Sequence, residues 1–101
     1  MNSKEIEEKI IEQFKQDEEM MILVFTQWCV NHDLDPMEIY LKAYPDQQHN
    51  PRLLKMMELA VPKEEAGHIP DETLLGVLDL YGNHDLASVT MEEKANQLKR
   101  S

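Results

Sequence analysis

Residues 20–30, MMILVFTQWCV, form the most apolar stretch of this sequence and decide its fold class. A helix drawn through this stretch carries apolar residues on every side, which predicts a central, buried helix over about residues 18–31. Asp17, Glu18 and Glu19 precede it and place negative charge where a helix N-terminus favours it. No glycine or proline separates Gln16 from Asp17, so this helix is either separate from a helix over residues 3–16 or continuous with it.

The N-terminal segment is predicted to be an amphipathic helix over residues 3–16. Asn2 to Glu5 have the spacing of a capping box, and an apolar stripe follows at helical intervals among Glu and Lys residues. That stripe consists of Ile6, Ile10, Ile11 and Phe14.

Two cap-then-proline pairs, Asp35-Pro36 and Asn50-Pro51, predict the starts of two further helices. The first is expected to stop before Pro45 and the second before Pro62. Their predicted buried faces are Met37, Tyr40, Leu41 and Tyr44 in the first, and Leu53, Leu54, Met57, Ala60 and Val61 in the second.

The C-terminal third begins after a polar surface connection and carries two more predicted helices. Pro70-Asp71 starts one over residues 71–81, and Gly82-Asn83 ends it. Thr90 to Glu93 have capping-box spacing for a sixth helix with little apolar content, so the last ten residues are expected to fray or to pack on a partner. The wide apolar face of the first of these helices is Leu74, Leu75, Val77, Leu78, Leu80 and Tyr81.

Together these patterns predict an all-α protein, a compact bundle of five to six short helices in a single domain over residues 1–101. The N-terminal amphipathic helix occupies residues 1–16, the central helices 17–61, the surface loop 62–70 and the C-terminal helices 71–101. No segment has the alternation typical of strands.

The tetrapeptide Asn-His-Asp-Leu occurs twice, at residues 31–34 and 83–86, and the apolar residues before each copy also align. A shared way of ending a buried helix explains this best, with a left-handed Asn and a Leu that folds back on the last turn. A diverged helix-loop-helix duplication is the alternative.

The net charge of −10 on 101 residues excludes several classes of partner. A polyanion would approach against a repelling field, so no direct nucleic-acid binding is expected. The longest apolar run, residues 20–25, is far shorter than the roughly 20 residues that span a bilayer, so no membrane association is expected. The N-terminus has acids where a signal peptide is basic, and the lone Cys29 cannot form an internal disulfide; a cytoplasmic location is therefore expected.

Candidate catalytic groups are few, and the protein is predicted not to be an enzyme, with no cofactor and no metal. His32-Asp33 and His84-Asp85 offer the ligand types of a metal-dependent hydrolase, which we keep as an alternative function. Cys29 and His32 have the i,i+3 spacing of a thiolate–imidazole pair, yet the apolar surroundings of Cys29 favour a buried, unreactive thiol.

Seven methionines beside six aromatic residues predict either a methionine-filled core, which is favoured, or a deformable binding cleft. With the acidic surface, this leads to the main functional prediction: a small acidic cytoplasmic protein-binding or regulatory protein that uses an apolar helical face rimmed by carboxylates. We expect the partner to be a protein, either a basic protein or a second copy of the chain. The second copy is the simplest of these partners. An acidic inhibitor or antitoxin-like mimic of nucleic acid that binds a basic protein is another alternative. The residues predicted to bind the partner are Ile6, Ile10, Phe14, Glu18, Glu19, Met91 and Leu98.

Overall fold

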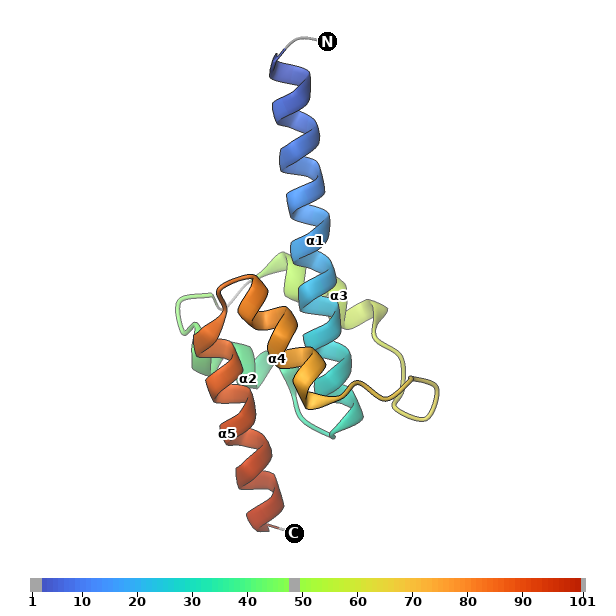
Figure 1. The fold of residues 1–101 in the computed structure, drawn as a ribbon. Coiled ribbons are helices and arrows are strands. Elements are labelled where there is room, and N and C mark those ends of the chain that lie inside the picture. Colours follow the sequence, from blue (N-terminus) through green and yellow to red (C-terminus); the bar gives the residue numbers. More distant parts are fainter. Residues whose placement is uncertain (1–2, 48–49, 101) are drawn as a thin grey trace.

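Five α-helices and no strand make up the regular structure of the computed structural model, which describes residues 3–47 and 50–100 (Figure 1). The all-α prediction is therefore confirmed. The helices are α1 (Ser3–Asn31), α2 (Pro36–Ala43), α3 (Pro51–Leu59), α4 (Asp71–Leu80) and α5 (His84–Arg100). None of them, within the part of the chain that is described, is both long enough and apolar enough to cross a membrane.

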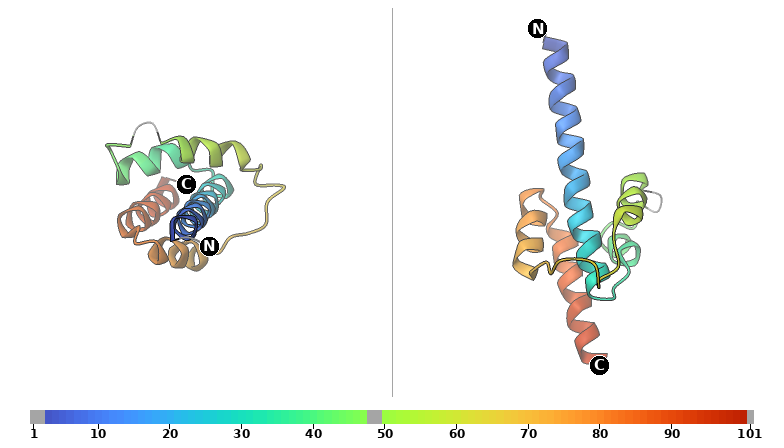
Figure 2. Two further views of the ribbon diagram at one scale, coloured as in Figure 1. Left: turned by 90° about the horizontal axis from the view of Figure 1, so that it is seen from above. Right: turned by 90° about the vertical axis from the view of Figure 1, so that its right-hand side faces the viewer.

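The first helix is longer than the segmented prediction, because α1 runs without interruption through the expected boundary at residues 16–17. A helix continues where nothing breaks its hydrogen-bond ladder, and this segment contains neither glycine nor proline. The C-terminal half of α1 lies among the other helices, while its N-terminal half projects away from them (Figures 1 and 2).

The core is built around the C-terminal half of α1. Viewed along α1 in Figure 2, α2 and α3 lie on one side of it, α4 lies on the opposite side, and α5 packs beside it against α2 and α4. Burying apolar surface in this way is the main favourable term in folding, at about 25 cal/mol per Å². The buried apolar residues are Met21, Ile22, Phe25, Trp28, Cys29, Ile39, Tyr40, Leu53, Met56, Leu74, Leu78 and Leu86.

The two predicted cap-then-proline starts are both present. The Asp35 carboxylate accepts hydrogen bonds from the backbone N–H groups of Met37 and Glu38, at 2.9 and 3.4 Å. The Asn50 side chain does the same for Arg52 and Leu53, at 3.0 and 3.3 Å. These bonds satisfy N–H groups that the first turn of a helix leaves without a partner.

The buried faces of α3 and α4 are narrower than predicted. In α3 the fully buried residues are Leu53 and Met56, whereas Leu54 is 46% exposed. In α4 they are Leu74 and Leu78, whereas Leu80 is 80% exposed. A short helix packed on one side buries only residues three or four positions apart, so the rest of its apolar residues face outward.

The last helix starts earlier than predicted and does not fray. It begins at His84, and Thr90 lies in its interior with its hydroxyl donating to the carbonyl of Leu86 at 2.6 Å. Thr90 is therefore a buried helical residue and not a cap. Residues 92–100, which were expected to fray or to pack on a partner, continue the helix to Arg100, and Ser101 lies outside the described residues.

The two Asn-His-Asp-Leu copies differ in backbone conformation, which corrects the proposed role of asparagine. In the first copy the left-handed residue is Asp33 (φ 58°), and the Leu34 N–H bonds the Cys29 carbonyl at 2.8 Å. At the end of α4 the left-handed residue is Gly82 (φ 71°), one position before the second copy. The C-terminal ends of α1 and α4 both have the hydrogen bonds of a Schellman motif, but the residues of the repeated tetrapeptide occupy different positions in the two motifs.

Candidate functional site

Glu18 and Glu19, both predicted to bind a partner, pair within the molecule with cations of α3. Glu18 forms an ion pair with Arg52, and Glu19 lies 3.4 Å from the Lys55 ammonium. These pairs are partly exposed, so each contributes at most about 1 kcal/mol. The two carboxylates therefore help to seat α3 on α1, and Glu18 also borders a hollow described below.

The other predicted partner-binding residues belong to α5 and to the N-terminal half of α1. Met91 is partly buried and packs against the core, while Leu98 is exposed near the end of α5. Ile6, Ile10 and Phe14 belong to the projecting half of α1, and their side chains lie outside the described residues. The structure thus does not test the predicted set as one surface, and its role in binding stays a prediction.

A different apolar surface lies between α1 and α4. We call it the α1–α4 groove, a depression of about 230 Å³ lined by Met20, Met21, Val24, Val77, Leu80 and Tyr81. Met20 is 59% exposed and Leu80 is 80% exposed, so two large apolar side chains of the groove meet solvent. Exposed apolar patches of this kind are typical of surfaces that contact another molecule.

The register of the two helices explains why the groove forms. Near one end of the contact the Trp28 indole bonds Asp71, and at the other end Met20 and Leu80 line the same depression. The helices therefore run in opposite directions, with the C-terminal end of α4 beside the place where α1 leaves the body (Figure 1). Leu74 and Leu78 take the buried positions of α4, which leaves Val77 and Leu80 along its edge.

A second hollow of about 360 Å³ adjoins the groove and shares Leu80 and Tyr81 with it; its other lining residues are Glu18 and Asn83. The Asn83 side chain accepts a hydrogen bond from the Tyr44 hydroxyl at 2.5 Å. The groove thus passes at this end into a polar border that includes one carboxylate.

The two His-Asp pairs considered for a metal site lie far apart. Gln97, near the end of α5, donates to the His32 carbonyl at 2.7 Å, whereas His84 is the first residue of α5. Gln97 and His84 are thirteen positions apart on this helix, and a rise of 1.5 Å per residue places the two His-Asp pairs roughly 20 Å apart. Asp33 pairs with Lys63, and His84 lies 3.1 Å from Asp79. Among the described residues no group of three or more His, Cys, Asp or Glu side chains converges on a possible metal position.

Cys29 is a core residue and has no exposed surface. Burial, followed by the nearby Asp35 carboxylate, raises the pKa of its thiol well above the ordinary value. His32 is engaged elsewhere, since its Nδ1 lies 2.8 Å from the Trp28 carbonyl and its ring stacks on the indole with centroids 4.1 Å apart. Because the thiolate is the reactive form, this environment suits packing and not nucleophilic chemistry.

A shallow hollow of about 440 Å³ contains a cluster of polar side chains; it is lined by His32, His68, Pro70, Asp71, Glu72 and Lys94. The Asp71 carboxylate accepts a hydrogen bond from Trp28 Nε1 at 3.0 Å and pairs through its other oxygen with Lys94. The Lys94 ammonium, aided by the Trp28 N–H, lowers the pKa of Asp71 below the ordinary aspartate value. These contacts tie α1, α4 and α5 together at one carboxylate.

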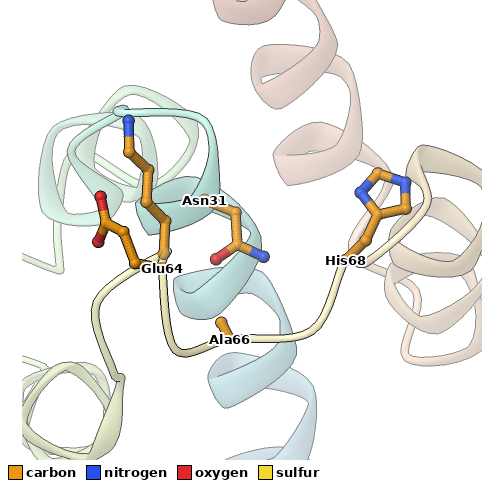
Figure 3. Close-up of a pocket in the computed structure, with 5 residues that line it drawn as sticks. Asn31, Glu64, Ala66 and His68 are labelled. Carbon is orange, nitrogen blue, oxygen red and sulfur yellow. The ribbon is translucent and has the colours of Figure 1, made fainter.

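The loop between α3 and α4 covers a further pocket of about 340 Å³, lined by Asn31, Lys63, Glu64, Ala66 and His68 (Figure 3). Asn31 donates to the Gly67 carbonyl at 3.2 Å, so its amide anchors the loop. In Figure 3 Glu64 and His68 lie at opposite ends of the loop and do not converge.

Sequence reasoning missed the α1–α4 groove because it assigned Leu80 and Tyr81 to the core. The available signal was spacing. Leu74 and Leu78 are four residues apart and share a helix face, whereas Leu80 follows Leu78 by two positions and so lies on a different face. Met20 was placed on the all-round apolar helix, where spacing alone cannot identify the outward side.

Comparison with known proteins identifies relatives of the chain by sequence. The profile of a family described as YxiS matches residues 2–95. A protein of Bacillus subtilis (strain 168) named "Uncharacterized protein YxiS" is 59% identical to this chain over 87 residues. The match covers 85% of this chain and 91% of that relative. No solved structure matches the chain.

Proposed function

This chain belongs to the YxiS family, and we propose that it is a non-enzymatic protein that binds another polypeptide through the α1–α4 groove. The observation that carries this proposal is the exposure of Leu80 and Met20 in one groove between two helices. Leaving large apolar side chains in water forgoes about 1.5–3 kcal/mol for each, which a bound partner would recover.

The polar clusters of the described residues support a binding role over a catalytic one. The Asp71 carboxylate and the Asn31 amide each hold helices or loops of the chain in place. The thiol of Cys29 is buried, and His32 stacks on Trp28. A catalytic site needs a nucleophile or base that is free to meet a substrate. Asn31, His32 and Asp71 border shallow hollows, but each is engaged in a contact that holds the fold. We place the interaction in the cytoplasm, where a lone reduced cysteine is stable.

The test compares three forms of the protein as immobilised baits in an extract of the cells that make it. Leu80→Gln removes the apolar contact from the groove, and Leu59→Gln is its matched control, because Leu59 is 57% exposed on α3 outside the groove. We expect a polypeptide retained by the native protein and by Leu59→Gln but lost from Leu80→Gln. Identical retention by all three would refute the proposal.

Two other forms of partner binding make different predictions. A symmetric dimer through the same groove predicts a doubled mass in light scattering that Leu80→Gln abolishes. An inhibitor that mimics nucleic acid is favoured by the charge of −10 and predicts capture of a basic protein that Leu80→Gln leaves intact and that high salt abolishes.

A further inference from the structure

The middle of α4 carries a glycine that the fold itself does not need. Gly76 lies within Asp71–Leu80, and a Cβ added there would meet no atom within 4 Å. Its backbone conformation is open to other residues, since Gly82 is the glycine with positive φ in α4 and its C-terminal turn. Alanine forms helices better than glycine does, so Gly76 weakens α4 without an internal reason.

Gly76 lies on the exposed side of α4 beside the groove. It precedes Leu80 by four residues, so the two positions are neighbours on one helix face, and Val77 follows it at the groove wall. The absence of a side chain at this point lets another backbone approach α4 closely. A glycine next to the most exposed leucine of the described chain is the arrangement expected where a second helix packs against α4.

The two helices that form the groove carry most of the negative charge. In α1 seven acidic residues face three lysines, and α4 has three acidic residues and no lysine or arginine. Among the described side chains, Glu18, Glu19 and Asp71 pair with lysine or arginine residues of other helices. Asp79 lies 3.1 Å from His84 of α5. By formal charge α1 carries −4 and α4 carries −3, out of −10 for the whole chain. A second copy of the chain would bring the same charge and be repelled, whereas a cationic segment would be attracted.

The backbone of α1 extends past the groove as the projecting half of the helix (Figure 1). Eighteen residues make five turns of an α-helix, so position 6 lies on the same side of α1 as Val24, and position 10 on the same side as Trp28. A helical segment seated between Met20 and Leu80 and aligned with α1 would lie beside this projecting half.

We propose that the occupant of the α1–α4 groove is a basic amphipathic helix of another protein, seated with its apolar stripe on Met20, Val77 and Leu80 and its backbone close to Gly76. The lysines and arginines of that helix flank the stripe and face the carboxylates of α1 and α4. This inference rests on the proposed function and specifies its partner class.

The test uses a synthetic, fluorescently labelled 18-residue peptide of leucine and lysine, with leucines at helical i,i+3/i+4 spacing. A second peptide has the same composition with the leucines dispersed, and a third replaces lysine by glutamate. Binding is measured by fluorescence anisotropy at low and high salt. We expect the patterned lysine peptide to bind at least tenfold more tightly than either control peptide and to lose affinity as salt rises.

Variants of the protein locate the binding. Leu80→Gln and Gly76→Gln are each expected to weaken binding of the patterned peptide at least tenfold, whereas Leu59→Gln leaves it unchanged. Glutamine is a good helix former, so Gly76→Gln places a side chain beside the groove, where the partner backbone would approach, without unfolding α4. An unchanged circular dichroism spectrum checks this. Equal binding by all variants, or equal binding of patterned and dispersed peptides, would overturn the inference, because charge alone then explains the contact.

Failure of this inference is distinguishable from failure of the proposed function. If no peptide binds in a groove-dependent manner while Leu80→Gln still loses a polypeptide from the extract, the partner is not a basic helix but the protein-binding function stands. If light scattering shows a dimer that Leu80→Gln dissociates, the occupant is a second copy and the inference is wrong. If Leu80→Gln still binds both the patterned peptide and the polypeptide from the extract, the inference and the proposed function are both wrong.

Discussion

The indole Nε1 of Trp28 donates a 3.0 Å hydrogen bond to Oδ1 of Asp71, which joins the buried end of α1 to the first residue of α4. Trp28 is fully buried and is the single tryptophan of the chain, so its fluorescence reports on this junction. The other oxygen of Asp71 pairs with Lys94 of α5. One carboxylate therefore fixes the position of α4, and with it one wall of the α1–α4 groove.

Replacing Asp71 is expected to destabilise the protein more than replacing its cationic partner. Asp71→Ala leaves the buried Trp28 N–H without an acceptor, which costs about 1–3 kcal/mol. Lys94→Met removes a partly exposed ion pair and costs about 1 kcal/mol or less. Urea unfolding followed by Trp28 fluorescence measures both, with the exposed neighbour Glu72→Ala as a control expected near zero. Equal losses for Asp71→Ala and Glu72→Ala would show that the indole bond is not stabilising.

The same junction predicts a loss of stability in acid. The pKa of Asp71 is lower in the folded protein than in the unfolded chain, where it is near the ordinary value of about 3.9. Its contribution is therefore fully present above about pH 4 and is lost as the pH falls through the lower, folded pKa. In Asp71→Asn this contribution is absent. The difference in unfolding free energy between the native protein and Asp71→Asn should be constant above about pH 5 and shrink as the pH falls below about 4. A difference that stays constant in this acidic range would contradict the assignment.

Two glycines with equally open surroundings are expected to respond oppositely to alanine. Neither Gly76 nor Gly82 has an atom within 4 Å of an added Cβ, but only Gly82 has a positive φ. Gly76→Ala should stabilise the protein by up to about 1 kcal/mol through helix propensity. Gly82→Ala should destabilise it by about 1–2 kcal/mol through left-handed strain. Thermal unfolding of the two variants checks the contrast; a shift of the same sign in both would contradict the cap described at the end of α4.

Leu80 and Leu78 provide a matched test of which side of α4 holds the fold together. Leu78 is fully buried, so Leu78→Ala should cost about 2–5 kcal/mol. Leu80 is largely exposed, so Leu80→Gln should change stability by less than about 0.5 kcal/mol. Denaturant titration of the two variants gives both values. A large loss in Leu80→Gln would mean that this residue belongs to the core and that the groove is not free.

Cys29 should react slowly with thiol reagents. Its side chain is buried and its thiol pKa is raised, so labelling requires opening of the core. We expect the native protein to react at least about a thousandfold more slowly than the urea-unfolded chain, in keeping with ordinary folding equilibria. Mass spectrometry after timed exposure to iodoacetamide measures the two rates. Similar rates would place Cys29 at the surface and reopen a reactive role for it.

The parts of the fold that could be predicted from sequence are those set by local chemistry. The starts of α2 and α3 follow from Asp35 and Asn50. Their side chains cap the helices by accepting hydrogen bonds from backbone N–H groups only two or three residues later in the sequence. The start of α5 was misplaced because Thr90 has the spacing of a cap while its hydroxyl bonds within a helix that has already begun.

The groove could not be predicted because it depends on packing between distant segments. The sequence DETLLGVLDL is apolar on more than one side, and only its contact with α1 through Leu74 and Leu78 leaves Leu80 outside. The isolated Gly76 was a local signal, since an interior helical glycine often has a packing or functional reason. The pairing of Glu18 and Glu19 with α3 likewise depends on residues more than thirty positions away.

The central claim, that the α1–α4 groove binds a polypeptide, is tested most directly by site-specific photo-crosslinking in living cells. A photo-crosslinking amino acid is placed at position 80 in one variant and at position 59 in another, since both positions are exposed and only the first lines the groove. We predict a discrete crosslinked product of higher mass from position 80 and none from position 59. No product from position 80, or the same products from both positions, would contradict the account.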